Sequence, residues 1–306
     1  MLRALRSRLA CVALAVTGAA ACATEAVGDD GLASARDDAL IEGRLALAGQ
    51  FPATVYIQGL CTATKIAPKR FLTAAHCVLD PATVSLRYPP GAPIALAHDP
   101  SKGYASVVVS AVHVHPSWLK ACDESYCAAA AVTARLDAAD VAVIDLATDL
   151  EDVPVAPIDS TPLAGGDHVT VTGFGCTVGV YAPEPLGRGA LRYGETSLID
   201  ADRAVHDGSP VRASDVSQVA AIYALTQGPG RAPTLAGLCP GDSGGALFRR
   251  RAGGSYAVVG VNSNYTLGPE TGDAVGLPVT NWHTRLDEKS RHGVGRWLRS
   301  LGVPTL

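Results

Sequence analysis

The sequence predicts an all-β protein in which many short strands form barrels or sandwiches. Charged residues make up only 18 % of the 306-residue chain, whereas glycine (32 residues) and proline (20 residues) are plentiful, as in turn-rich proteins. From Phe51 onward, short runs of β-branched and apolar residues alternate with Pro/Gly turns. Such runs are typical of barrels and sandwiches, and this pattern alone does not choose between the two.

The predicted strands form two groups, one in each half of the chain. Those of the first half are Thr54–Ile57, Thr64–Ala67, Phe71–Thr73, Val84–Arg87, Val107–Val114 and Val141–Leu146. Those of the second half are His168–Thr172, Ala190–Ile199, Ala220–Thr226, Ala246–Phe248, Ala257–Asn262 and Val275–Leu277. A helix is predicted at Lys289–Leu301, where apolar residues recur at helical spacing.

The N-terminus has the layout of an export signal over residues 1–21. Three arginines precede the apolar run Leu9–Ala21, which ends in small residues. Cleavage before Cys22 and cleavage before Thr24 both remain open. The first resembles a bacterial lipoprotein site, in which Cys22 becomes a lipid anchor. The protein is therefore predicted to be exported, and either secreted or anchored by lipid to the outside of the cell membrane.

Charge and composition indicate a tether after the export signal and limit which partners and cofactors are expected. Residues 22–40 are acidic and poor in large apolar groups, which indicates a mobile pro-segment or tether. The net charge is −4 without a basic run, so nothing suggests a nucleic-acid partner. His113 and His115 alternate along a strand, but nearby carboxylates do not complete a ligand pattern, and no metal is expected.

Three motifs carry the side chains of a nucleophilic site. His76 lies in Phe71–Val78, Asp140 lies in Ala138–Leu146, and Ser243 lies in the glycine-rich stretch Cys239–Leu247. A serine hydroxyl needs a base and an anion-binding site beside it. Glycines around Ser243 let bare N–H groups approach a substrate, and those of Gly241 and Ser243 are candidates for an oxyanion hole. Taken alone, the last motif also fits a glycine-rich turn before a strand.

In this order, His…Asp…Ser, the motifs resemble the chymotrypsin/trypsin-like serine peptidases. The resemblance spans residues 41–301. It implies two six-stranded antiparallel β-barrels, over 41–155 and 160–288, followed by a C-terminal α-helix at 289–301. His76 and Asp140 would come from the first barrel and Ser243 from the second, with the site in the cleft between them.

The resemblance also implies a reaction. Ser243 attacks the scissile carbonyl, His76 carries the proton, and Asp140 orients His76. An acyl-enzyme forms and water hydrolyses it, without a metal or an organic cofactor. The expected partners are a polypeptide substrate and a protease inhibitor. Two alternatives are a peptidase-like protein that only binds and an esterase that uses the same three residues.

Six cysteines remain after the signal region, an even number that fits a disulfide-bonded exported domain. Fifteen pairings are conceivable from number alone. The family's histidine loop implies Cys61–Cys77, and Cys122 and Cys127 are close enough in sequence to pair locally. A Cys176–Cys239 bridge then departs from the family pattern. Cys176 follows Gly173-Phe174-Gly175, which resembles the family's Gly-Trp-Gly turn.

Activation and specificity are also read from the resemblance. Ile41-Glu42-Gly43 resembles the family's mature N-terminus, so the α-amine of Ile41 would pair with Asp242. Gly237 stands where basic-specific members carry an Asp, and Ser263 and Tyr265 lie across the predicted pocket. We therefore expect a preference for small or medium apolar residues before the cut. Asp273 is a candidate countercharge from the following loop.

Overall fold

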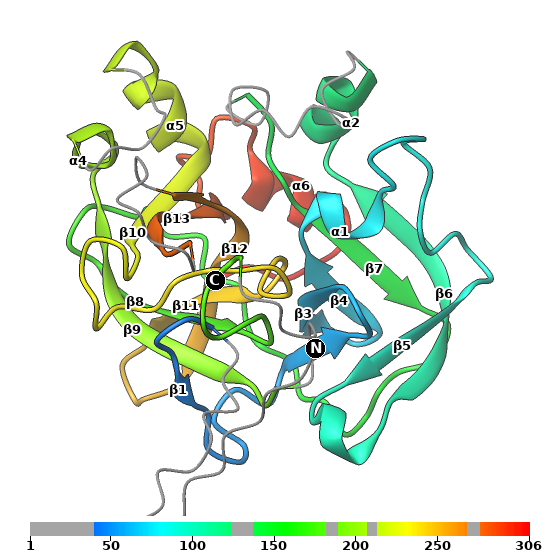
Figure 1. Ribbon diagram of the computed structural model, residues 1–306. Coiled ribbons are helices and arrows are strands. Elements are labelled where there is room, and N and C mark those ends of the chain that lie inside the picture. The colour runs from blue at the N-terminus through cyan, green and yellow to red at the C-terminus, as the bar shows by residue number, and fades with distance from the viewer. Residues whose placement is uncertain (1–39, 124–136, 182–188, 207–212, 268–275) are drawn as a thin grey trace, which may run out of the picture. The chain divides into compact units, whose positions relative to one another are not determined.

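The computed structural model describes residues 40–123, 137–181, 189–206, 213–267 and 276–306. Its strands form two closed, six-stranded antiparallel barrels that lie side by side (Figure 1). The predicted export signal and Cys22 fall outside the described residues. None of the helices in the described ranges is long and apolar enough to cross a membrane.

The first barrel closes in the order β2-β3-β4-β7-β6-β5. Its strands are β2 (Thr54–Ile57), β3 (Cys61–Ala67), β4 (Arg70–Thr73), β5 (Pro93–Ala97), β6 (Ala105–Val114) and β7 (Ala142–Leu146). Because β4 and β7 run antiparallel and Thr73 pairs with Ala142, the residues just after β4 and just before β7 meet at one end of the barrel. This register brings together the segments that carry His76 and Asp140.

The second barrel follows the order β9-β10-β13-β12-β11-β8 and closes through β8–β9 pairing. Its strands are β8 (His168–Gly173), β9 (Arg192–Ile199), β10 (Tyr223–Gln227), β11 (Ala246–Arg250), β12 (Tyr256–Leu267) and β13 (Pro278–Arg285). The short strand β1 (Arg44–Leu45) adds to β9. Ser243 stands just before β11, and β11 pairs with β8, which leads into the Gly173-Phe174-Gly175 turn.

One apolar cluster joins the two barrels. It includes Phe71 of the first barrel, Phe248 of the second, and Val294 and Leu298 of the C-terminal helix α6 (Val294–Ser300). Phe51 stacks on Phe248 with ring centroids 5.4 Å apart. Burying one such ring contributes roughly 1.5–3 kcal/mol, so this cluster holds the barrels against each other.

Four predicted elements differ from the structure. Val84–Arg87 forms only an isolated bridge, between Leu86 and Leu79, and the barrel strand is β5. Of the predicted strand Ala220–Thr226, the first part belongs to helix α5 (Val216–Ile222), because a short apolar run fits a buried helix as well as a strand. The last strand is β13 rather than Val275–Leu277, of which Val275 is not described. The C-terminal helix begins at Val294, just after Gly293.

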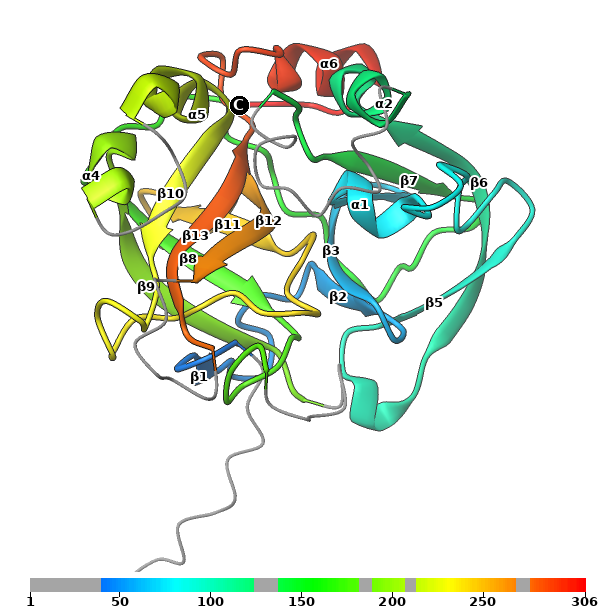
Figure 2. The same cartoon turned by 45° about the horizontal axis from the view of Figure 1, so that its top comes forward.

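The remaining helices flank the barrels (Figure 2). They are the short α1 (Ala75–Val78), which carries His76, α2 (Pro116–Asp123), α4 (Ala201–His206), and the 3-10 turns at Pro100–Lys102 and Ala213–Asp215. Of these, α1 matters most for the site, because its four residues follow β4 directly and place His76 at the end of the first barrel.

Candidate active site

His76 and Asp140 form a close pair at the end of the first barrel. The Nδ1 atom of His76 lies 2.7 Å from Oδ2 of Asp140, and the His76 amide donates to Oδ1 at 3.0 Å. Asp140 is fully buried, whereas the His76 side chain is 26 % exposed. A carboxylate accepts hydrogen bonds, so Nδ1 carries the ring proton and Nε2, which lies 3.8 Å from Cys77 Sγ, is left unprotonated as the basic nitrogen.

The second barrel holds Asp140 as well. Ser263 of β12 donates its hydroxyl to Oδ2 of Asp140 at 2.6 Å, and Thr284 of β13 donates to the Asp140 carbonyl at 3.0 Å. Tyr223 donates to the carbonyl of Ala138 at 3.0 Å. The sequence placed Ser263 in the specificity pocket. In the structure its hydroxyl binds the Asp140 carboxylate that contacts His76, and its place in the pocket stays a prediction.

The loop that carries Ser243, residues 240–245, packs against the end of the first barrel that carries His76. We call this segment the nucleophile loop. The Thr62 amide of β3 donates to the Ser243 carbonyl at 2.8 Å. Gly244 has φ +81°, and a Cβ there would come within 2.1 Å of Thr73 Oγ1. Only glycine therefore allows the loop to approach the end of β4, three residues before His76.

The Ser243 side chain is partly exposed. Within the described residues, its hydroxyl makes no hydrogen bond to His76. Such bonds often tighten only when a substrate is bound, so the free geometry is compatible with a Ser–His pair.

Every carbonyl from Pro240 to Ser243 accepts a hydrogen bond. Pro240 accepts from the Cys176 amide at 3.2 Å and Gly241 accepts from Thr62 Oγ1 at 2.8 Å. Asp242 accepts from the Gly245 amide at 3.0 Å and from Asn262 Nδ2 at 3.2 Å. In a trans peptide the N–H of a residue points away from the carbonyl of the residue before it. The bonds to the Pro240 and Asp242 carbonyls therefore aim the N–H groups of Gly241 and Ser243 in the opposite direction.

In the described part of the chain, the N–H groups of Gly241 and Ser243 donate no hydrogen bond. Unused, fixed donors next to a nucleophile are what an oxyanion hole requires. Gly241 has φ +103°, and a Cβ there would lie 2.7 Å from the Cα of Gly175. A glycine is therefore required at position 241 both by its backbone conformation and by this contact.

Two residues that hold this loop were missed in the sequence, Thr62 and Asn262. Thr62 is fully buried, and its hydroxyl also accepts the Phe174 amide at 3.2 Å. Thr62 therefore links the first barrel to both the nucleophile loop and the Gly-Phe-Gly turn. No local motif marks either residue, because their partners lie far away in sequence.

Asp242 is buried beneath the Gly173-Phe174-Gly175 turn. Its carboxyl accepts the amides of Gly175 at 2.8 Å and Cys239 at 2.9 Å. Cβ atoms at Gly173 and Gly175 would fall 2.0 Å and 2.6 Å from atoms of this carboxyl group, so the turn needs both glycines. Burial raises the pKa of Asp242 to about 8, although the two amide donors act to lower the pKa.

The structure does not bring Ile41 to Asp242. The Ile41 amide donates to the Gly237 carbonyl at 3.1 Å, and the Gly237 amide donates back at 2.9 Å. Both backbone groups of Ile41 are thus used in this bridge. Leu40 is fully buried in the second barrel's core and has φ +72°, a conformation that costs an L-residue energy.

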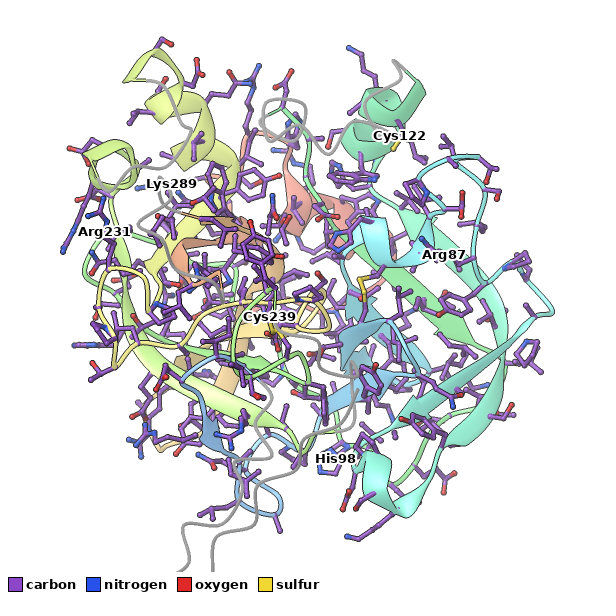
Figure 3. The ribbon with its side chains drawn as sticks, viewed as in Figure 1. Arg87, His98, Cys122, Arg231, Cys239 and Lys289 are labelled. Carbon is purple, nitrogen blue, oxygen red and sulfur yellow. A yellow bond between two sulfur atoms is a disulfide. The ribbon has the colours of Figure 1, made fainter. Side chains whose placement is uncertain are left out.

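Both predicted long-range disulfides are present. Cys61–Cys77 joins β3 to α1 with Cα atoms 6.2 Å apart, and Cys176–Cys239 joins the Gly-Phe-Gly turn to the nucleophile loop with Cα atoms 5.7 Å apart. Figure 3 places Cys239 near the centre of the view and Cys122 beside α2. Cys122 is disulfide-bonded, while its predicted partner Cys127 is outside the described residues.

Proline rings lie beside Gly237, the residue predicted at the base of the specificity pocket. A Cβ at Gly237 would lie 2.7 Å from Pro229 and 3.3 Å from Pro278, so proline rings pack against the position that carries Asp in basic-specific relatives. Tyr265 lies half-buried opposite Asn281 on β13 and packs on the second barrel's core. Asp273 lies outside the described residues.

Comparisons with known proteins agree with this architecture. The family model described as Trypsin matches residues 40–283. Among solved structures, human heparin binding protein is similar, with a TM-score of 0.55 and 19 % sequence identity over 86 % of this chain and 97 % of that chain. At this identity the similarity shows the fold alone. A search of the curated proteins finds no match.

Proposed function

This chain belongs to the trypsin family, and on that basis we propose that it is an active, exported serine endopeptidase. One observation carries the proposal: His76, its buried partner Asp140, and the Ser243 loop with two unused amides converge where the barrels meet. Acyl transfer needs a nucleophile, a base with an orienting group, and donors for the oxyanion.

The residues divide the chemistry as follows. Ser243 attacks the carbonyl of the peptide bond while Nε2 of His76 takes the hydroxyl proton. Asp140 stabilises the resulting imidazolium, and the amides of Gly241 and Ser243 hold the oxyanion. His76 then gives its proton to the leaving amine, and water hydrolyses the acyl-enzyme by the reverse sequence of proton transfers.

We assign the enzyme a preference for small or medium apolar residues before the cut. Two observations support this assignment: position 237 carries a glycine rather than an acid, and proline rings lie beside it. Its expected partners are polypeptides and protease inhibitors, met outside the cell. The lipid anchor at Cys22 stays a hypothesis that rests on the sequence.

Activation remains a proposal, and we now assign the freed amine to the residue before the one that the sequence suggested. The sequence assigned the freed amine to Ile41, whose backbone is engaged with Gly237. We assign it to Leu40, after a cut at Ala39–Leu40, and the start of the family match at residue 40 supports this choice. A residue freed at its N-terminus no longer has a constrained φ, so this cut also relieves the strain at Leu40.

The alternative of a protein that only binds is favoured by one fact, the name of the human heparin binding protein. A net charge of −4 does not suit a polyanionic ligand. The third possibility, an esterase, uses the same residues and differs only in substrate.

One set of experiments separates these functions. The mature protein is titrated with a serine-reactive phosphonate and assayed on matched peptides and esters, with Ser243→Ala as the control. We expect stoichiometric labelling, peptide cleavage, and a loss on the order of 10⁴-fold or more in the variant. A purified wild type that is neither labelled nor active would reject the proposal. N-terminal sequencing of active material then decides between Leu40 and Ile41.

A further inference from the structure

A buried hydrogen-bond network runs from the nucleophile loop through the interior of the second barrel. Asn262 donates its Nδ2 to the carbonyls of Thr172 at 2.8 Å and Asp242 at 3.2 Å. Since both partners are acceptors, the orientation of the amide is determined, and its Oδ1 faces Nδ1 of His283 at 2.8 Å. We call Asn262, His283, Thr226 and Asn281 the barrel network, and all four are fully buried.

The protons of the barrel network follow from its contacts. Asn262 Oδ1 can only accept, so His283 carries its proton on Nδ1. Burial lowers the pKa of His283 to about 3, which keeps the ring neutral and makes Nε2 an acceptor. Thr226 lies 3.1 Å from that nitrogen, and its hydroxyl must therefore donate.

At its far end the network reaches the segment around Gly237. Asn281 donates to Thr226 Oγ1 at 3.1 Å and to the Ala236 carbonyl at 2.9 Å, and it accepts the Leu238 amide at 2.8 Å. The residues on both sides of Gly237 are thus fixed by the same side chain. Every contact uses a complementary donor and acceptor, which is the condition for a buried polar network to rigidify its surroundings.

We propose that Asn262 is a positioning residue for the oxyanion hole. It holds the carbonyl of the Asp242–Ser243 peptide and so aims the Ser243 amide at the oxyanion. His283, Thr226 and Asn281 link this peptide to the segment around Gly237, so that the oxyanion hole and the pocket are set by one hydrogen-bonded unit. The inference deepens the proposed function and rests on it.

The first test cuts the network in the middle. Thr226→Val removes the hydroxyl shared by His283 and Asn281 and leaves the bonds of Asn262 to the loop in place. Thr64→Val is the matched control, because Thr64 is a buried strand residue whose hydroxyl has no hydrogen-bond partner among the described residues. Both variants are assayed per active site on two peptides that differ only in the residue before the cut.

Loss of a whole oxyanion donor costs about 10²–10³ in kcat, and a loosened donor should cost about tenfold. We expect this fall in kcat for Thr226→Val, with a changed ratio between the two peptides. Thr64→Val should stay within about twofold of wild type. A Thr226→Val variant that melts earlier but matches the control in kcat and in peptide ratio would show that the network is structural only.

The second test removes the network end at the loop. Asn262→Leu with His283→Phe replaces both partners by apolar side chains, which leaves no orphaned ring proton and favours folding. We expect kcat to remain at least about tenfold below wild type in the folded double variant. Recovery of kcat in that variant would overturn the positioning role. If the double variant does not fold, Thr226→Val alone decides.

Two measurements do not need turnover. They distinguish a failure of the proposed peptidase function from a failure of the positioning role of Asn262. A peptide boronic acid forms a tetrahedral adduct with Ser243, and its affinity should fall at least as far as kcat in Thr226→Val. Nitrogen NMR should show His283 neutral and protonated on Nδ1 from about pH 4 to 9, given its lowered pKa. A ring protonated on Nε2, or one that titrates near neutral pH, would contradict the inference even if the wild type is inactive.

Discussion

Replacing Thr62 by valine tests how the first barrel supports the nucleophile loop. Valine keeps the shape of threonine and removes only the hydroxyl, which donates to the Gly241 carbonyl and accepts the Phe174 amide. The site is fully buried, so water cannot replace these partners. An unsatisfied buried backbone group costs roughly 1–3 kcal/mol. Two such groups predict a loss of about 2–6 kcal/mol in the free energy of unfolding.

The effect on catalysis is separable from the effect on stability. Gly241 carries one of the two amides that we assign to the oxyanion hole. The Thr62 hydroxyl holds the next peptide, through the Gly241 carbonyl, so Thr62→Val leaves that amide present but less firmly held. We expect kcat to fall by about tenfold while KM changes little, because only transition-state stabilisation is reduced. For a chain of this size the melting temperature should fall by roughly 4–24 °C. Calorimetry and steady-state kinetics on the active-site-titrated enzyme measure both.

Two further variants make this prediction decisive. Thr62→Ser keeps the hydroxyl and should restore most of kcat. Thr64→Val, on the same strand, removes a hydroxyl that has no partner in the part of the chain that the structure describes, and it should change neither quantity. If Thr62→Val and Thr64→Val give equal kcat values, the hydroxyl of Thr62 does not support the oxyanion hole.

Three other outcomes are expected. The folded pKa of Asp242, about 8, lies above its unfolded value near 3.9, so its contribution to stability is complete below about pH 4 and is lost as pH rises to about 8. Uncut Ser243→Ala protein should therefore lose stability over that interval, and adding Asp242→Asn should flatten the pH dependence of its melting temperature. Replacing both Cys176 and Cys239 by serine should cost about 4 kcal/mol in the chain-entropy model, because they are 63 residues apart; denaturant unfolding that shows no loss would contradict this value. A peptide-library profile should favour small or medium apolar residues before the cut, and a strong preference for Arg or Lys would show that another acid reaches the pocket.

Several parts of the fold were legible in the sequence because they depend on short-range pattern. The alternation of apolar runs and turns predicted the strands β2, β4 and β7 within a residue. The strand β5 was missed because Pro93 and its alanines have weak strand propensity, and pairing with β2 and β6 decides its conformation. Helix α5 was missed because a short apolar run does not reveal its own period.

The positions of His76, Asp140 and Ser243 were determined by the sequence alone, since each lies in a motif whose neighbours have a local role. The glycines beside Ser243 are an example, because the loop has no room for a Cβ at Gly244. The sequence also supplied the cysteines for both long-range bridges. The freed amine stays a prediction: the motif suggested Ile41, and the pairing of the Ile41 backbone with Gly237 leads us to propose Leu40 instead.

The hydrogen bonds that hold these residues in place could be seen only in the folded chain. Thr62 and Gly241 are 179 positions apart, Ser263 and Asp140 are 123 apart, and Asn262 meets His283 across two strands of a barrel. Such contacts depend on how strands pair and how two barrels dock, which are global packing outcomes. A threonine or an asparagine looks the same in a sequence whether its polar group faces water or a catalytic loop. The residues of the proposed site could therefore be predicted from local motifs. Contacts between distant segments determine how these residues are aligned.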